Sequence, residues 1–376
     1  MSPSATADTT STTENVEANI FTPSEKAVGS LGSTEQRGEQ QLGINHRQPL
    51  KPSGALDHFE SFDVTPVIGR EFVNVDVAEW LRAPNSDELI RELAITISRR
   101  GVVFFRKQDN ITNDLQKELV QRLGQLTGKP ESSGLHIHPA FNPGQEHGGS
   151  DNEISVISSE QAKKMYSKAL QKSQSQRMQW HSDITFEPVP SDYTLLRLTQ
   201  LPKIPCGPQD TKSMKESRSL YASSYYAQPA FGEAATKNNF TIYPGPRGSP
   251  LNVGDTLEAN HPVVRTNPIT GWKSVFAVGI HAQKINGLTE EESRHFLQWF
   301  VQLIVENHDL QVRNRWQNVN DLAIWDNRSV YHAATPDYIG EGLGERTGSR
   351  AVSIGEQPYF DPASVSRREG LSQEQV

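Results

Sequence analysis

The stretch Trp-His-Ser-Asp-Ile-Thr-Phe occupies residues 180–186 and carries two candidate metal ligands. Side chains alternate along a strand, so His181 and Asp183 are predicted to project from one face. A neutral imidazole beside a carboxylate supplies two corners of a facial site for Fe(II), which leaves coordination positions for other molecules. A single His-x-Asp pair is common by chance, so an ordinary surface pair is the alternative.

A third ligand is expected in residues 323–333, which read Ala-Ile-Trp-Asp-Asn-Arg-Ser-Val-Tyr-His-Ala. The pattern is that of an apolar strand, a polar turn and then His332. A second histidine completes the set of two histidines and one carboxylate that holds non-haem Fe(II). His181, Asp183 and His332 are therefore the predicted metal ligands.

Two arginines follow in residues 345–354, Glu-Arg-Thr-Gly-Ser-Arg-Ala-Val-Ser-Ile. Arg346 and Arg350 are four residues apart, a spacing that puts them on one face of a strand. A planar, permanently charged guanidinium matches a carboxylate, so the pair could serve a pocket for a dicarboxylate. The alternative is a pair of exposed arginines beside an edge strand.

Short β-rich runs separated by Gly, Pro and Asn dominate the chain after residue 150. They fall at residues 154–157, 193–198, 274–278, 321–325 and 351–354. Earlier, apolar spacing predicts helices at 87–100 and 113–126, and the apolar run Val102–Phe105 suits a buried strand. Thr289 with Glu292 forms a capping box ahead of one further helix. The pattern predicts a mainly β fold with flanking helices, arranged as a sandwich or jelly roll.

Composition limits the remaining possibilities. The chain has 376 residues, 35% hydrophobic residues, a net charge of -8 and a single cysteine, Cys206. Residues 1–52 are polar and are expected to form a disordered tail, ahead of one domain at 53–368 and a short tail at 369–376. No long apolar run and no basic stripe are present, so neither membrane nor nucleic acid is an expected partner. We expect a soluble cytoplasmic protein, with homo-oligomerisation left open.

These motifs together resemble the taurine dioxygenase / 2,4-dichlorophenoxyacetate dioxygenase family of 2-oxoglutarate-dependent enzymes, and the fungal sulfonate dioxygenase branch in particular. The resemblance runs over most of residues 57–368. Besides the ligand and arginine motifs, it is carried by residues 56–59 (Leu-Asp-His-Phe), 134–139 (Gly-Leu-His-Ile-His-Pro), 180–188 (Trp-His-Ser-Asp-Ile-Thr-Phe-Glu-Pro), 263–268 (Val-Val-Arg-Thr-Asn-Pro) and 325–332 (Trp-Asp-Asn-Arg-Ser-Val-Tyr-His).

The resemblance implies a double-stranded β-helix (jelly-roll) core, with Fe(II), 2-oxoglutarate and O₂ as cofactor and cosubstrates. It implies that Arg346 pairs with the distal carboxylate of 2-oxoglutarate. The groups that it implies around a substrate sulfonate are the side chains of His138 and Arg350, the backbone of Ile184, and the apolar neighbours Phe141 and Phe276. His136 and His138 could instead suggest a second metal site, but no carboxylate or cysteine lies at ligand spacing from them.

One segment departs from the family pattern. Relatives carry a Gly-Gly-Asp-Thr turn after the metal strand, then an apolar stretch with a tryptophan and a helix. Here residues 206–217 read Cys-Gly-Pro-Gln-Asp-Thr-Lys-Ser-Met-Lys-Glu-Ser, and the tryptophan is missing. The resemblance assigns Thr211 to the 2-oxoglutarate carboxylate. Two interpretations of this departure at residues 206–226 are open: the segment is genuinely altered and leaves the pocket more accessible to water, or the gene model is shortened.

The expected activity is hydroxylation of an organosulfonate, taurine-like or an alkanesulfonate, at the carbon bearing sulfur. This reaction would release sulfite and an aldehyde while 2-oxoglutarate becomes succinate and CO₂, a role in sulfur metabolism. The alternatives are the same chemistry on another anion (an aryloxy-carboxylate, a sulfate ester or a secondary-metabolite intermediate) or an anion-binding relative with impaired catalysis.

Overall fold

A computed structural model describes residues 47–139, 151–160, 179–202, 210–214, 226–229, 242–334 and 344–374. All of them belong to the unit at residues 45–376, one of two units into which the chain divides. The expected domain limits at 53 and 368 stay predictions. The short helix α8, Arg367–Gln373, begins just before the second of these limits.

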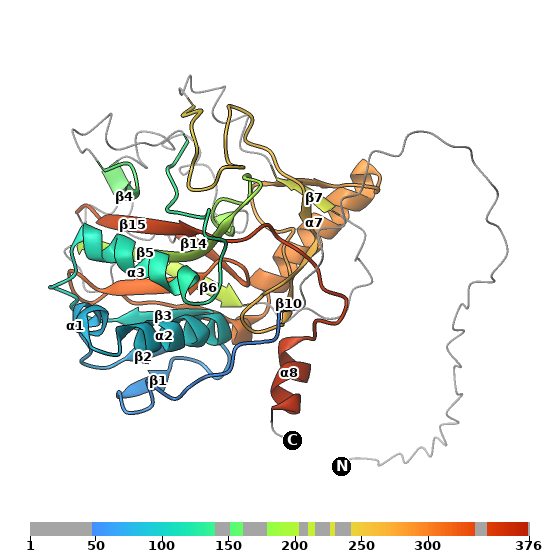
Figure 1. Ribbon diagram of the computed structural model, residues 1–376. Coiled ribbons are helices and arrows are strands. Elements are labelled where there is room, and N and C mark those ends of the chain that lie inside the picture. Colours follow the sequence, from blue (N-terminus) through green and yellow to red (C-terminus); the bar gives the residue numbers. More distant parts are fainter. Residues whose placement is uncertain are drawn as a thin grey trace, which may run out of the picture. The chain divides into compact units, whose positions relative to one another are not determined.

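A seven-stranded sheet forms the main layer of this unit (Figure 1). Neighbouring strands are antiparallel except β2 and β3, which are parallel. In spatial order the strands are β1 (Ser61–Asp63), β2 (Arg70–Phe72), β3 (Val102–Phe105), β13 (Leu322–Asp326), β5 (Ser191–Gln200), β15 (Thr347–Ile354) and β4 (Ile154–Ser158).

Three smaller sheets accompany it among the described residues. In one, β6 (Asp210–Met214) lies between β12 (Gln311–Arg313) and β14 (Val330–Ala334). The others are β11 (Ala282–Ile285) with β7 (Tyr226–Pro229) and β8 (His261–Pro262), and the pair β9 (Val264–Thr266) with β10 (Lys273–Val275). The fold is therefore mainly β, as the sequence predicted.

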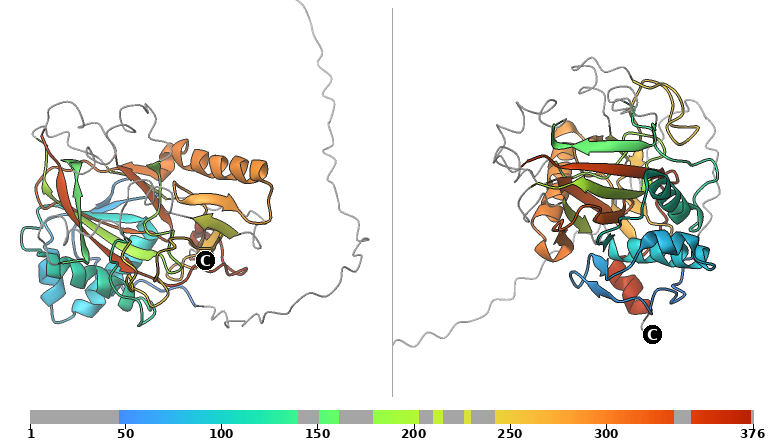
Figure 2. Two further views of the ribbon diagram at one scale, coloured as in Figure 1. Left: turned by 90° about the horizontal axis from the view of Figure 1, so that it is seen from above. Right: turned by 90° about the vertical axis from the view of Figure 1, so that its left-hand side faces the viewer.

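Helices α1 (Val77–Arg82), α2 (Ser86–Arg100) and α3 (Asn113–Gln125) gather on one side of the large sheet (Figures 1 and 2). Their apolar faces share one buried cluster with Val103 and Phe105 of β3 and with Leu322 and Ile324 of β13. This cluster is the largest of the four apolar clusters among the described residues. The predicted helices at 87–100 and 113–126 are confirmed.

The opposite face of the same strands is buried as well. Val102 and Phe104 of β3 and Trp325 of β13 lie in a second cluster, which includes Val312 of β12. Alternate residues of each strand thus enter different clusters, which explains why the run Val102–Phe105 is apolar throughout. Strand β12 packs over this second face through Val312.

Helix α7, Glu290–Val305, begins with the predicted capping box, in which Thr289 and Glu292 satisfy each other's backbone. Its Phe300 and Ile304 pack into a third cluster, together with Val275 of β10 and Tyr331 of β14. A 3₁₀ turn at His308–Leu310 follows. None of the described helices is long and apolar enough to cross a membrane.

Candidate metal centre

His181 and His332 face each other across a single antiparallel bridge. The His181 amide donates to the His332 carbonyl at 3.0 Å, and the His332 amide donates to the His181 carbonyl at 2.9 Å. Their ring centroids are 4.4 Å apart. His332 is in the middle of strand β14 and follows the apolar strand and polar turn that the sequence pattern predicted. The bridge brings two imidazoles that are far apart in sequence to one point.

Asp183 lies beside both imidazoles. Its Oδ1 is 3.9 Å from His181 Nε2 and 3.8 Å from His332 Nε2. One ligand atom from each of the three residues lies within 4.8 Å of the others, and Asp183 is buried at 3% exposure. The chain therefore brings two imidazole nitrogens and one carboxylate oxygen together around a point where one cation fits.

The predicted cause of this proximity, side-chain alternation along a strand, was wrong. Asp183 does not continue a strand from His181; it begins a turn, and Ile184 has a φ of 63°. A buried β-branched residue in this region is strained by roughly 1–3 kcal/mol, a cost that is typical of functional sites. The turn aims the Asp183 carboxylate at the histidines.

The protein fixes which nitrogen of His181 faces the centre. His181 Nδ1 lies 2.7 Å from the Gln179 carbonyl, so it carries the proton and donates. The lone pair is then on Nε2, the nitrogen turned toward Asp183. On the other side, the Trp325 ring lies 4.9 Å from the His332 ring and restricts its rotation. The residues present thus fit a divalent cation whose bonds to N and O are about 2.0–2.2 Å long.

Backbone anchors hold the turn after Asp183. His261 Nε2 lies 2.9 Å from the Thr185 carbonyl and 3.0 Å from the Glu187 carbonyl, so it donates to both. Arg247 Nη2 donates to the Glu187 carboxylate at 3.0 Å, and both side chains are almost fully buried. These contacts tie the turn that begins at Asp183, called the metal turn below, to the buried core.

Of the two predicted arginines, Arg350 reaches the centre. Its Nη1 donates to Asp183 Oδ1 at 3.0 Å from strand β15. Arg346, just ahead of β15, is buried at 3% exposure, and its amide donates to Ser159 Oγ at 3.0 Å. The alternative of two exposed arginines at an edge is thereby excluded for both, since β15 lies between β5 and β4.

His138 and His136 lie with ring centroids 5.9 Å apart, near enough to Arg350 and Asp183 for both charges to act on them. Burial, with the Arg350 and Asp183 charges acting in opposite directions, lowers the pKa of His138 to about 3. Burial also lowers the pKa of His136 far below its ordinary value, with the His138 charge as the next cause. Both imidazoles are therefore neutral at physiological pH and would act as hydrogen-bonding groups.

The other predicted residues have different outcomes. The Phe276 ring packs 5.6 Å from the His261 ring and under the Arg265 guanidinium at 4.8 Å. Phe141 and Cys206 lie outside the described residues. Thr211 is described only through its backbone, which pairs with Ala333 in β14, one residue from His332.

Sequence reasoning missed a polar group next to His181. The His281 ring lies 5.9 Å from the His181 ring, and His281 Nδ1 is 3.0 Å from Thr185 Oγ1. It also missed Thr194 and Asn327, which contact Asp183 directly. Asn327 falls in the polar turn that precedes His332, and that turn was the signal available in the sequence.

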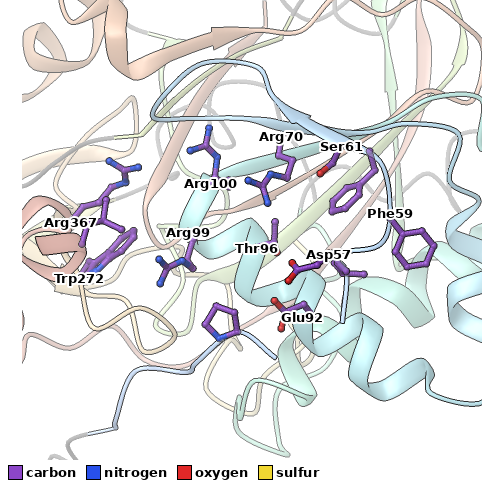
Figure 3. Close-up of a pocket in the computed structure, with 14 residues that line it drawn as sticks. Asp57, Phe59, Ser61, Arg70, Glu92, Thr96, Arg99, Arg100, Trp272 and Arg367 are labelled. Carbon is purple, nitrogen blue, oxygen red and sulfur yellow. The ribbon is translucent and has the colours of Figure 1, made fainter. Parts of the chain in front are cut away.

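A separate cavity of about 460 Å³ lies between helices α2 and α8 and the segment around Asp57 (Figure 3). Its arginines have partners within the protein: Arg70 pairs with Asp63, Arg99 with Glu374, and Arg100 donates to backbone carbonyls. None of the three predicted metal ligands, His181, Asp183 and His332, lines this cavity.

Comparisons with known proteins agree with this centre. Residues 60–352 match the family model described as "Taurine catabolism dioxygenase TauD, TfdA family". An alpha-ketoglutarate-dependent (2-oxoglutarate-dependent) dioxygenase of Neocamarosporium betae is 51% identical, over 86% of this chain and 98% of the relative. An alpha-ketoglutarate-dependent sulfonate dioxygenase of Saccharomyces cerevisiae is 25% identical, over 81% of this chain and 72% of the relative.

Among solved structures, a taurine dioxygenase from Burkholderia xenovorans superposes with a TM-score of 0.58 at 22% identity, covering 82% of this chain and 93% of the other. This likeness shows a shared fold. Fold, centre and relatives define the class: a 2-oxoglutarate-dependent non-haem iron dioxygenase, whose chemistry requires Fe(II), 2-oxoglutarate and O₂. The chain belongs to the TauD/TfdA dioxygenase family.

Proposed function

We propose that this dioxygenase hydroxylates an organosulfonate, taurine-like or an alkanesulfonate, at the carbon that bears sulfur, and so releases sulfite and an aldehyde. In this proposal His181, Asp183 and His332 hold the iron. The observation that carries it is the cation of Arg350 at the edge of the Asp183 carboxylate, 3.0 Å from Oδ1, where it can meet an anion bound beside the metal.

The proposal includes a double-stranded β-helix (jelly-roll) core. It is supported by the fold shared with the taurine dioxygenase structure and by the bridge between His181 and His332, which joins the metal turn to β14. The two histidines would then come from opposed segments at one mouth of the core. A topology of this kind holds ligands from distant parts of the chain on rigid backbone.

The roles of the chain's own residues follow from their chemistry. Arg346, buried and permanently charged, would pair with the distal carboxylate of 2-oxoglutarate, and Thr211 would add a hydroxyl. When bound, iron with its cosubstrates supplies the oxidising power for hydroxylation. Arg350 would orient the sulfonate, and His138, neutral at physiological pH, would donate one hydrogen bond to it. The backbone of Ile184 and the rings of Phe141 and Phe276 would complete the substrate pocket.

A second candidate is the same oxidation of another anionic substrate, such as a carboxylate, a sulfate ester or a secondary-metabolite intermediate. It is favoured by the pattern of identities: the name of the 51% identical relative mentions no sulfonate, whereas two relatives named for sulfonates are 30% and 25% identical. The polar pair Thr185 and His281 beside His181 would suit a substrate with more hydrogen-bonding groups than an alkyl chain has.

One assay separates the two candidates. The protein is incubated with Fe(II), 2-oxoglutarate and either taurine, hexanesulfonate, hexyl sulfate or hexanoate, and succinate and sulfite are measured together. Sulfite released from the sulfonates only, together with succinate, is the expected result. Succinate stimulated by the carboxylate or the sulfate ester, with no sulfite from either sulfonate, would transfer the proposal to the second candidate.

A further inference from the structure

The Asp183 carboxylate is held on both of its oxygens. Arg350 Nη1 contacts Oδ1, while the Thr194 hydroxyl donates to Oδ2 at 3.0 Å. Thr194 belongs to strand β5 and is fully buried. Because Oδ2 is bound by a neutral group of the protein, Oδ1 is the oxygen presented to the histidines.

Asn327 closes a ring of hydrogen bonds around Asp183. Its side-chain Nδ2 donates to Thr194 Oγ1 at 2.8 Å, and its Oδ1 accepts from the Asp183 amide at 3.2 Å. The Thr194 hydroxyl therefore accepts from Asn327 and must direct its own proton to Asp183. Asn327 is buried at 1% exposure, so water does not compete for these bonds.

The side-chain amide of Asn327 also contacts Trp325, the residue that packs against His332. Trp325 Nε1 donates to Asn327 Oδ1 at 3.0 Å, and the Trp325 ring packs against the His332 ring. The Asn327 carbonyl accepts from Ser182 Oγ at 2.7 Å. One side chain in the turn between β13 and β14 thus touches the supports of two of the three proposed ligands.

We propose that Asn327 and Thr194 are positioning residues for the metal centre: together they lock the Asp183 carboxylate so that only Oδ1 is offered to the cation. The inference rests on the proposed ligand set and adds to it the groups that give that set its geometry. Neither side chain belongs to the proposed ligand set, so both would act through Asp183. Partners of ligating carboxylates typically change metal affinity by about 10–100-fold when they are removed.

The test measures Mn(II) affinity by calorimetry on the metal-free full-length protein, without turnover. Thr194→Val keeps the shape but removes the hydroxyl, and we expect about 10-fold or greater weakening. Thr194→Ser restores the hydroxyl and should bind within about threefold of the parent protein. Asn327→Asp keeps the size, but it removes the donor to Thr194 and adds a negative charge, so it should change affinity and the Mn(II) EPR line shape together.

Thr127→Val is the matched control, because it removes another buried hydroxyl, one that donates to the Leu123 carbonyl at the end of α3. It should cost thermal stability without changing Mn(II) affinity. Equal affinity loss in Thr194→Ser and Thr194→Val, or unchanged affinity in Thr194→Val, would overturn the positioning role.

A His181→Ala arm separates this inference from the ligand assignment on which it rests. If His181→Ala binds Mn(II) as well as the parent protein does, the proposed centre itself is wrong. If His181→Ala loses Mn(II) while Thr194→Val retains it fully, the centre stands and only the positioning role falls.

Discussion

Arg350 Nη1 lies 3.0 Å from Asp183 Oδ1, the same carboxylate oxygen that lies 3.8–3.9 Å from the two histidine Nε2 atoms. Arg350, which is proposed to bind the substrate anion, is therefore in direct contact with Asp183, which is proposed to bind iron. A metal ion that binds Asp183 competes with Arg350 for one oxygen, and a substrate anion competes with Asp183 for one guanidinium. Metal binding and anion binding should each favour the other.

The first prediction follows from this contact. Arg350→Gln should strengthen Mn(II) binding by roughly fivefold or more, the low end of coupling between linked sites, because a competing cation has been removed. The same change should weaken binding of a sulfonate. Calorimetry measures both affinities, and Arg99→Gln, which breaks the distant pair with Glu374, is the control. Weaker Mn(II) binding by Arg350→Gln would argue that Arg350 supports the metal instead of competing with it.

Substitution of Arg346 and substitution of Arg350 should weaken the binding of different ligands. Arg346→Ala is expected to weaken 2-oxoglutarate binding by roughly 3–5 kcal/mol, because a buried carboxylate loses its partner. Arg350→Gln should leave 2-oxoglutarate binding within about tenfold of the parent protein. Titration of each variant with 2-oxoglutarate in the presence of Mn(II) gives the comparison, and a reversed order would mean that the two roles are exchanged.

Buried histidines such as His261 should lower the stability of the folded protein at acidic pH. Burial, with the Arg265 charge as a second cause, lowers the pKa of His261 to about 4. The folded protein keeps this imidazole neutral, while the unfolded chain takes up a proton below about pH 6.5. The contribution of His261 to stability is thus complete above pH 6.5 and is lost as the pH falls toward 4, by about 1.4 kcal/mol at pH 5.5.

Urea unfolding of the metal-free protein at pH 7.5 and pH 5.5 measures this loss. His261→Gln, which retains a donor for the Thr185 carbonyl, should lose less stability between the two pH values than the parent protein does. His295→Gln changes an exposed histidine of α7 and should behave as the parent. An unchanged pH dependence in His261→Gln would show that His261 is not the group responsible.

Residues 206–226 give a prediction about coupling. The polar run 212–219 stands where the family resemblance predicts an apolar helix. Without such a helix the pocket would admit more water, hold 2-oxoglutarate less firmly and allow turnover without substrate oxidation. We therefore expect weak 2-oxoglutarate affinity and more succinate than sulfite with taurine and with longer alkanesulfonates. A one-to-one ratio of the two products would show that the altered segment is harmless.

Local patterns in the sequence predicted much of the frame and part of the centre. The helices at 87–100 and 113–126, the strand Val102–Phe105 and the capping box at Thr289 depend on neighbouring residues, and all four are present. The pairing of His181 with Asp183 was correct in proximity although not in cause, because the positive φ of Ile184 depends on tertiary anchors. No local pattern could reveal the bond of Asn327 to Asp183, 144 residues away.

The most direct test of the central claim is anaerobic titration of the protein with Fe(II) and 2-oxoglutarate, followed by visible absorption. The charge-transfer band of the chelated metal should appear in the parent protein. It should be lost in His181→Ala, Asp183→Ala and His332→Ala, each of which should still unfold cooperatively in urea. His295→Ala should retain the band. A band of parental intensity in any of the three ligand variants would contradict the proposed iron site.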